Sequence, residues 1–446
     1  MKINKTHLFV FALLSLNACS TVSGIFVSAD ETPPLEGERI SILELQKTLK
    51  VDTPLKKNEN VAMPQAWQNP AWPQAGGFPN HSMQNLSFSD DTPVKAWSSK
   101  AGRGSRDDLP QNAQPIVAEN MVFSLDTKAH LHAFNALDGK KLWSQDVGSK
   151  DEKEDVITGG IAYAHGTLFV TNGYDEALAV SLADGTILWR KTLPAPSRAA
   201  PSILSGRIYI STIDSRLIAL NATDGAGLWE YHGVGETAGL FGAASPAVNQ
   251  NTVIGVFSSG EVTALRVENG SIAWSDNLSS LNSFGGGLEG LSDITAMPVM
   301  SQGLIIAMSY SGKIAAIDER TGERVWQREI GGTRTPWVAG NALYVLSAEN
   351  QLIGINIKDG SIFWITQLER FKNEKRMKDL IHWSSPIIAG NRLILTSSHG
   401  YMIEVDPYSG EVFQKTKTKA NVQLTPAVAE NMLFPLTDNG QLVAYR

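Results

Sequence analysis

Residues 138–143 have the sequence DGKKLW, in which a glycine is followed four residues later by a tryptophan. The same spacing recurs further along the chain, in the pairs Gly185 and Trp189, Gly225 and Trp229, Gly270 and Trp274, Gly322 and Trp326, and Gly360 and Trp364. Tryptophan is the largest side chain, so its regular return in one local context indicates an internal structural repeat.

Each repeat contains four strand signals. The first is an apolar stretch that usually follows a proline, as in Pro115-Ile116-Val117, and a turn such as Glu119-Asn120 leads to the second. Asn and Gly tolerate the positive φ that such hairpin turns require. The third signal has the form small-x-apolar-x-Ala-apolar, as in residues 215–220, and the fourth carries the tryptophan. Alternation with period two is typical of strands, so each repeat predicts a four-stranded antiparallel blade of a β-propeller.

The third strand carries a small residue at one position in all repeats but one. These residues are Ala133, Ala179, Ala219, Ala264, Ala316, Gly354 and Ala444, and Glu404 is the large exception. A recurring small residue indicates that another group packs closely against the strand at that position.

The chain ends predict a closed ring. Residues 426–446 supply three strands, and residues 93–98 (PVKAWS) supply a tryptophan-bearing strand with no repeat in front of it. We therefore predict an all-β, eight-bladed β-propeller that is closed by pairing the N-terminal and C-terminal strands. Seven tryptophans and one glutamine then occupy eight equivalent positions: Trp97, Trp143, Trp189, Trp229, Trp274, Trp326, Trp364 and Gln414. Each indole is expected to cover the neighbouring blade, a contact of about 150–250 Å², because one blade cannot bury both of its faces.

Residues 1–18 have the features of a secretory signal peptide. Two lysines precede an apolar stretch at residues 8–16 that is too short to cross a bilayer as a helix. The sequence Leu16-Asn17-Ala18-Cys19 resembles a bacterial lipobox, which makes Cys19 the predicted lipid attachment site; the alternative is an ordinary signal peptide with a chance cysteine. Several acyl chains anchor firmly, since each buried CH₂ contributes about 0.8 kcal/mol. Ser20 favours the outer membrane, where the protein would face the periplasm.

The chain divides into three predicted parts. The signal peptide at 1–18 is followed by a flexible tether at 19–66 and an eight-bladed propeller domain at 67–446. The tether is polar and proline-containing and has no tryptophan or tyrosine, a composition that suits a linker. Within it, residues 38–49 could form either a short strand or a helix.

Composition limits the classes of function. A hydrophobic fraction of 42% fits a globular protein with a sizeable core. The net charge is −7, and it falls to −9 when Lys2 and Lys5 leave with the signal peptide, which argues against a nucleic-acid partner. Cys19 is the single cysteine of the chain, so no intrachain disulfide can form.

The sequence contains only weak matches to known catalytic, nucleotide-binding or metal-binding motifs. Residues 233–238 (GVGETA) match a dinucleotide-binding pattern but lead into no expected helix, and residues 285–287 lack the Lys-Ser/Thr of a phosphate loop. His130 and His132 would share one face of a strand, but no third metal ligand is evident, so we interpret them as exposed strand histidines. The charged stretch 369–379 (ERFKNEKRMKD) predicts a solvated helical loop between two blades; the alternative is a basic partner-binding or lipid-facing role.

The secretion signal, the lipobox and the tryptophan repeat together resemble the BamB family of lipoproteins in the outer-membrane β-barrel assembly (BAM) complex. The resemblance covers about residues 65–446 and includes residues 72–77 (WPQAGG). It implies a non-enzymatic scaffold that binds the POTRA domains of BamA and assists the insertion of β-barrel proteins into the outer membrane. Unfolded precursors of those proteins are further possible partners, through addition of a strand to an exposed edge.

The family docks on BamA through two interblade loops, which resemble residues 239–246 and 291–298 here. The implied partner-binding residues are Leu240, Phe241, Gly242, Leu291, Ser292 and Asp293. Phe241 stands where the family has an arginine and Thr295 where it has a second aspartate, so the charged part of the contact is altered while an apolar anchor is retained. Alternatively the loops merely connect blades, although residues 278–292 are long and glycine-rich for that role.

The sequence leaves two other classes of function open. Repeats of this kind also resemble those of PQQ-dependent quinoproteins, which implies a periplasmic oxidoreductase. Such enzymes place adjacent cysteines beside the cofactor together with acidic ligands for Ca²⁺, and this chain has neither a second cysteine nor an evident acid cluster. A generic periplasmic interaction propeller is the other alternative. We predict no catalytic residue, no metal and no cofactor.

Overall fold

The computed structural model describes residues 49–52, 61–106, 108–152, 154–234, 244–279, 293–310, 312–418 and 420–446. The chain divides into two units, residues 1–49 and 50–446, and the second contains the blades. The predicted signal peptide, Cys19 and most of the predicted tether lie outside the described residues.

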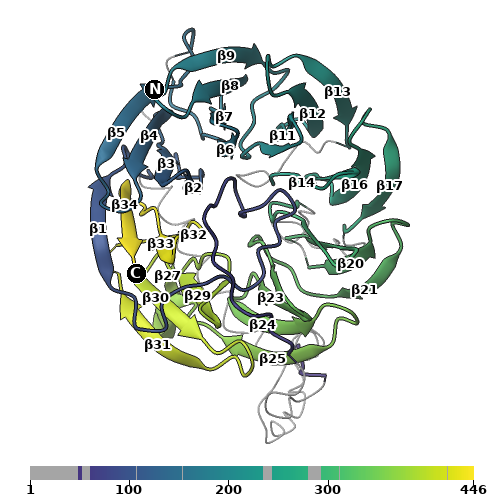
Figure 1. Ribbon diagram of the computed structural model, residues 1–446. Coiled ribbons are helices and arrows are strands. Elements are labelled where there is room, and N and C mark those ends of the chain that lie inside the picture. The colour runs from purple at the N-terminus through teal and green to yellow at the C-terminus, as the bar shows by residue number, and fades with distance from the viewer. Residues whose placement is uncertain are drawn as a thin grey trace, which may run out of the picture. The chain divides into compact units, whose positions relative to one another are not determined.

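Eight four-stranded antiparallel sheets form a ring, as predicted (Figure 1). Blade 1 contains β2 (Ile116–Ala118), β3 (Met121–Leu125), β4 (His130–Asn135) and β5 (Lys141–Asp146). Blade 2 contains β6 (Gly160–Ala164), β7 (Thr167–Thr171), β8 (Glu176–Ser181) and β9 (Ile187–Thr192). Blade 3 contains β10 (Ser202–Leu204), β11 (Arg207–Ser211), β12 (Arg216–Asn221) and β13 (Gly227–His232). Blade 4 contains β14 (Ala247–Val248), β15 (Thr252–Val256), β16 (Glu261–Arg266) and β17 (Ile272–Asn277).

The remaining blades repeat this order from the inside of the ring outward. Blade 5 contains β18 (Val299–Ser301), β19 (Leu304–Met308), β20 (Ile314–Asp318) and β21 (Arg324–Arg328). Blade 6 contains β22 (Trp337–Ala339), β23 (Ala342–Leu346), β24 (Gln351–Asn356) and β25 (Ile362–Gln367). Blade 7 contains β28 (Ile387–Ala389), β29 (Arg392–Thr396), β30 (Tyr401–Val405) and β31 (Val412–Lys417). Blade 8 combines β32 (Ala427–Ala429), β33 (Met432–Phe434) and β34 (Gln441–Tyr445) with β1 (Lys95–Lys100).

Blade 8 closes the ring by joining the two ends of the repeat region. Strand β1 pairs antiparallel with β34, and Trp97 lies opposite Ala444. The pairing extends one step further, because Val94 and Arg446 exchange two backbone hydrogen bonds of 2.9 and 3.0 Å. The predicted closure of the ring is therefore confirmed.

Each of the seven repeat tryptophans contacts the next blade through a hydrogen bond and through packing of its ring. The indole Nε1 donates a hydrogen bond of 2.7–3.2 Å to a backbone carbonyl in the turn region of the next blade. The ring plane lies over the turn glycine there: a Cβ on Gly185, whose φ is +79°, would lie 2.7 Å from the Trp143 ring. Glycine thus meets two requirements at once, a positive φ and room for the indole. This explains the Gly-Trp spacing.

The recurring small residue of the third strand lies beside the tryptophan of its own blade. Ala219 is opposite Trp229 across the ladder, and Gly354 is opposite Trp364. A Cβ on Gly354 would lie 2.5 Å from the Trp364 ring. The closely packed group that the sequence indicated is therefore the indole on the adjacent strand.

Blade 7 departs from this pattern, and the reason is the construction of its neighbour, blade 8. Gln414 occupies the tryptophan position in blade 7, and Glu404 lies opposite it. In blade 8 the strands β34 and β1 come from the two ends of the repeat region and are not joined by a turn. An eighth indole would therefore have no turn glycine to cover.

Residues 67–88, which we call the cap segment, cross the ring axis on one face of the propeller (dark purple in Figure 1). The segment forms a hydrogen bond to the innermost strand of every blade. In the order of blades 1 to 8 the partners are Trp72 with Val117, Pro73 with Tyr163, Gln74 with Ile203, Pro79 with Val248, Asn80 with Met300, Gln84 with Trp337, Leu86 with Ile388, and Asn69 with Val428. Trp72, Met83 and Leu86 are fully buried.

Residues 61–66, the described part of the predicted tether outside residues 49–52, also contact the propeller. The backbone N–H of Ala62 donates to Asn341 Oδ1 at 2.6 Å, and the Pro64 carbonyl accepts from Asn85 at 2.8 Å. Val61 is buried. Residues 61–66 therefore pack against the propeller, and the described residue Asp52 also contacts it, through Arg328 and Ile362.

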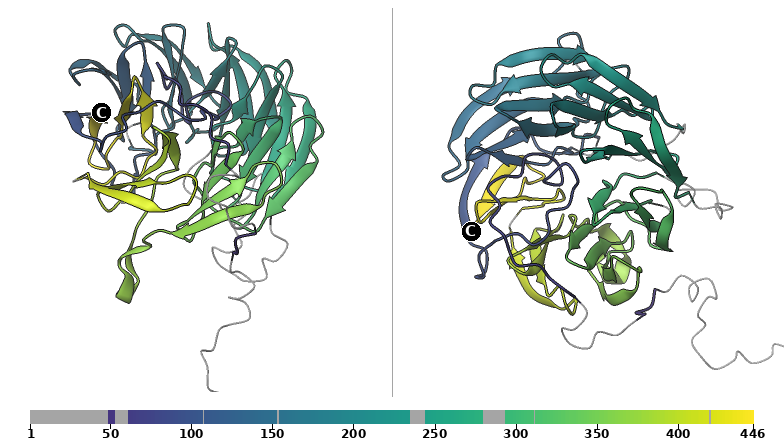
Figure 2. Two further views of the ribbon diagram at one scale, coloured as in Figure 1. Left: turned by 60° about the horizontal axis from the view of Figure 1, so that its bottom comes forward. Right: turned by 45° about the vertical axis from the view of Figure 1, so that its right-hand side comes forward.

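The charged stretch 369–379 forms a β-hairpin, so the predicted helical loop is wrong. Strand β26 (Phe371–Asn373) pairs with β27 (Lys378–Leu380), and a single 3₁₀ turn, η2 (Glu374–Arg376), connects them. The hairpin extends away from the ring between blades 6 and 7 (yellow-green in Figure 2, left). Pairing between the two strands provides backbone hydrogen bonds without burying either face of the hairpin. A short helix without tertiary packing is only marginally stable in water.

Shortening this hairpin is expected to leave the fold intact. Phe371 and Leu380 are cross-strand partners, so residues 372–379 can be replaced by Asn-Gly, which favours a two-residue hairpin turn. Every side chain removed is exposed, and we expect the free energy of unfolding to change by less than about 1 kcal/mol. Urea denaturation measures this, and a loss above about 2 kcal/mol would show that the hairpin supports the ring.

Candidate functional site

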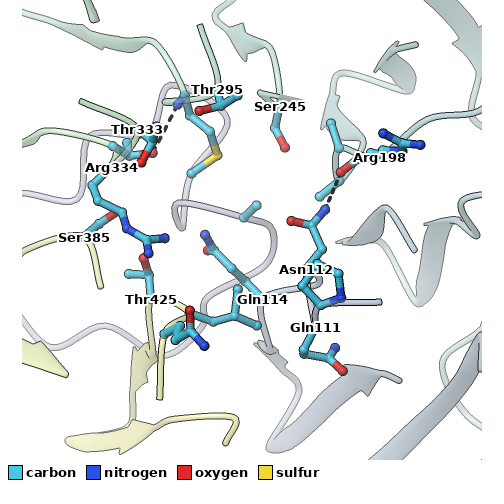
Figure 3. Close-up of a pocket in the computed structure, with 18 of the residues that line it drawn as sticks. Gln111, Asn112, Gln114, Arg198, Ser245, Thr295, Thr333, Arg334, Ser385 and Thr425 are labelled. Carbon is cyan, nitrogen blue, oxygen red and sulfur yellow. Dashed lines mark hydrogen bonds between the residues drawn. The ribbon is translucent and has the colours of Figure 1, made fainter. Parts of the chain in front are cut away.

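The propeller encloses a central cavity of about 440 Å³ (Figure 3). Eight of the residues that line it, one from each blade, stand just before the innermost strand, either next to it or separated from it by a single proline. In the order of blades 1 to 8 they are Gln114, Gly159, Ala200, Ser245, Met297, Thr335, Ser385 and Thr425. Ala75 of the cap segment also lines the cavity, so the cap segment forms part of its boundary.

The repeated proline explains why these residues face the axis. In seven of the eight blades the lining residue is followed by the proline that precedes the innermost strand, as in Gln114-Pro115 and Thr425-Pro426. Proline restricts the preceding residue to an extended conformation, so each connection enters its blade in the same way. The position before the repeated proline is therefore a sequence signal for the cavity, one that the blade pattern alone did not reveal.

The cavity carries a net positive charge among its described lining residues. Arg198 and Arg334 contribute +2 and Asp438 contributes −1, which leaves +1 in a protein whose overall charge is −7. Arg334 and Arg198 lie on opposite sides of the cavity (Figure 3). Asp438 accepts a hydrogen bond of 2.8 Å from the Gln423 amide. Burial lowers the pKa of Arg334, and the negative charge of Asp438 opposes this effect.

The two strand histidines form no metal centre within the described residues. His130 is partly exposed, as interpreted from the sequence, but His132 is buried, and that part of the interpretation is wrong. Neighbouring blades cover both faces of a propeller blade, so the middle of β4, which carries His132, has no solvent-facing side, whereas His130 at its end is partly exposed. His132 Nδ1 lies 2.8 Å from the Ser144 hydroxyl. In the parts of the chain that the structure describes, no group of three or more His, Cys, Asp or Glu side chains is arranged to hold a metal ion.

The neighbouring Asp126 has a structural role in the turn before β4. Burial alone would raise its pKa, but the nearby His132 ring and hydrogen bonds from the backbone N–H groups of Arg103, His130 and Lys128 lower the pKa of Asp126 to about 2. These bonds occupy the carboxylate oxygens, so the group holds the turn together as an anion.

The two loops implied as docking sites connect blades 3 to 4 and 4 to 5. Leu240, Phe241, Gly242, Leu291 and Ser292 lie outside the described residues. Asp293 is described and is buried, and its backbone carbonyl accepts a hydrogen bond of 3.0 Å from Tyr310. Ser245 and Thr295, at the ends of the two connections, both line the central cavity. Both loops therefore re-enter the propeller beside the cavity.

Among the described residues, none belongs to a helix with the length and apolar character needed to span a bilayer.

Comparison with known proteins shows which family this chain resembles in sequence. A family profile described as "Outer membrane protein assembly factor BamB" matches residues 86–153 and 147–366. The outer membrane protein assembly factor BamB of Escherichia coli is 27% identical over 356 residues, which cover 78% of this chain and 88% of that protein.

Two solved structures share the fold. BamB from Moraxella catarrhalis superposes with a TM-score of 0.64 at 19% identity, covering 80% of this chain and 98% of that one. Quinohemoprotein alcohol dehydrogenase from Comamonas testosteroni gives a TM-score of 0.64 at 12% identity, covering 85% and 81%. At these identities the likeness concerns the fold alone.

The interlocking tryptophans and the ring of eight blades define a β-propeller with PQQ-like repeats. The profile match spans more than half of the chain and includes β1 and blades 1 to 6. The chain belongs to the family of the outer membrane protein assembly factor BamB.

Proposed function

We propose that this protein is a non-enzymatic, lipid-anchored subunit of the outer-membrane β-barrel assembly complex. Family membership carries the proposal, because the matched residues include most of the propeller. The anchor would be Cys19, and the propeller would lie in the periplasm against the inner leaflet of the outer membrane. Attachment through acyl chains is consistent with the lipobox and supplies the membrane affinity that a single-chain anchor would lack.

The partner in this proposal is BamA, bound at its POTRA domains. The loops that contain Leu240, Phe241 and Gly242 and Leu291, Ser292 and Asp293 would form the contact. Their described ends lie beside each other around the central cavity, and adjacent loops on a rigid ring can present one continuous surface. An apolar anchor at the centre of such a contact is typical of interface hot spots. Unfolded precursors would be handled nearby by strand addition.

A quinoprotein oxidoreductase is the alternative that the shared fold raises. The residues present do not fit the cofactor. Cys19 is the single cysteine of the chain, so no adjacent pair is available. Among the described residues that line the cavity, Asp438 is the one carboxylate, and it is held by Gln423. Purified protein assayed for bound quinone and Ca²⁺ tests this alternative directly.

The docking surface is tested by the substitution Leu240→Asp. A charge at an apolar anchor cannot be desolvated without a partner, so we expect recovery of BamA from detergent-solubilised envelopes to fall about tenfold or more. Leu137→Asp is the matched control, because Leu137 is an exposed leucine in the β4–β5 turn. Undiminished recovery with Leu240→Asp would remove these loops as the docking surface.

A further inference from the structure

Arg334 is the feature of the central cavity that the proposed function does not use. It lies in the connection between β21 and β22 and extends into the cavity (Figure 3). Other arginines around the propeller form ion pairs, such as Arg190 with Glu176 at 2.8 Å and Arg324 with Asp276 at 2.6 Å. Within the described residues, the Arg334 guanidinium forms neither an ion pair nor a side-chain hydrogen bond, and it interacts electrostatically with Asp438 and His382.

The charge of Arg334 is not neutralised by its surroundings. Asp438, the nearby acid, attracts it without forming a direct ion pair and is bound to Gln423 instead. The pKa of His382 is affected by the same positive charge. Burial lowers the pKa of His382, the positive charge of Arg334 lowers it further, and Asp438 opposes both effects. Arg334 is partly buried, and withdrawing a cation from water without a direct partner is costly, so the cavity favours an anion.

Other residues that line the cavity supply neutral hydrogen-bond donors, and the cavity is large enough for a small anion. Gln114 Oε1 accepts a bond of 3.3 Å from the Gly76 N–H, which leaves its amide N–H groups available to the cavity. Hydroxyl groups of Ser245, Thr295 and Thr425 line other sides. A guanidinium surrounded by neutral donors is the usual arrangement for binding a carboxylate or phosphate. A volume of about 440 Å³ accommodates a small anion or the anionic end of a larger molecule.

We propose that the central cavity is an anion-binding site in which Arg334 contacts a carboxylate or phosphate group directly. The ligand is held by the guanidinium and the surrounding amide and hydroxyl donors. The site lies beside the two proposed docking loops but does not depend on them for its chemistry.

The test is calorimetric titration of the purified full-length protein with sodium succinate and, separately, with sodium phosphate. Sodium chloride at matched ionic strength corrects for screening. We expect saturable binding of at least one of the two anions, and we expect Arg334→Gln to weaken it about tenfold or more, since a charge-assisted contact is lost. Arg334→Lys keeps the charge but loses the planar fork, so it should retain phosphate binding better than succinate binding.

Arg320→Gln serves as the control, because Arg320 lies in the exposed β20–β21 turn away from the cavity. Thermal unfolding of each variant shows whether it is folded, and Arg334→Lys replaces Arg334→Gln if the latter is not. Absence of saturable binding to the native protein would overturn the proposal, as would binding by folded Arg334→Gln that equals that of the native protein or, where Arg334→Lys replaces it, equal succinate binding. The measurement needs no BamA, so its failure would leave the proposed docking function untouched.

Discussion

A chain that begins at residue 92 is expected to lose most of the stability of the propeller. This truncation keeps β1 and all eight blades but removes the cap segment. Trp72, Met83 and Leu86 are fully buried in the native protein, and burying three such side chains contributes at least about 5–9 kcal/mol. That loss is comparable with the whole stability of an ordinary domain, about 5–15 kcal/mol.

The reason for so large an effect is the position of the cap segment on the ring axis. It forms hydrogen bonds to the innermost strands of all eight blades, so its loss frees backbone groups around the whole ring. Buried backbone groups without partners are costly. The innermost strands would also be exposed to water on that face of the propeller.

The matched control is a chain that begins at residue 61. It loses the contact between Asp52 and Arg328, a 2.7 Å ion pair whose side chains are about one-third exposed, and exposed pairs contribute about 0–1 kcal/mol. Urea denaturation of the two truncated proteins gives the comparison. Equal unfolding midpoints would show that the cap segment covers the ring without stabilising it.

Arg392→Met is expected to have the second largest effect, a loss of about 3–5 kcal/mol in the free energy of unfolding. Arg392 and Glu404 form a buried ion pair in blade 7, with side chains 6% and 4% exposed. Arg392 also donates hydrogen bonds to the carbonyls of Ser89 and Asp91 and lies over the Phe88 ring. It therefore holds the chain between the cap segment and the closing strand β1.

Removing one partner leaves the other charge buried without compensation, which is the origin of the cost. The double variant Arg392→Met/Glu404→Leu should regain much of the loss, because apolar pairs of similar volume often replace buried ion pairs without penalty. Arg370→Met is the matched control, since its pair with Glu349 is exposed and should change stability by less than about 1 kcal/mol. A loss for Arg392→Met as small as that of the control would contradict this role.

The candidate site was only partly predictable. The docking residues came from a resemblance, and among them only Asp293 lies within the described structure. Arg334 carries no local signal, because a single arginine between two repeats looks like any surface cation. His132 was assigned to an exposed strand face because alternation along one strand does not reveal that blades cover both sides. The sequence predicts a helical loop where the structure has the hairpin at 371–380, because a run of charged residues is compatible with either an exposed helix or an exposed hairpin.

The repeat pattern was enough to predict the blade, the number of blades and the closure of the ring. The blade depends on neighbouring residues, because a positive-φ glycine, a tryptophan four positions later and strand alternation all act within one repeat. The number of blades and the closure follow from counting these repeats along the chain. The contacts at the centre of the ring and beside the closing strand could be found only in the folded protein. Asn69 meets Val428 across 359 residues, and Arg392 meets Ser89 across 303. Such contacts form only when all eight blades converge on one axis, and no local pattern records which distant residues will arrive there.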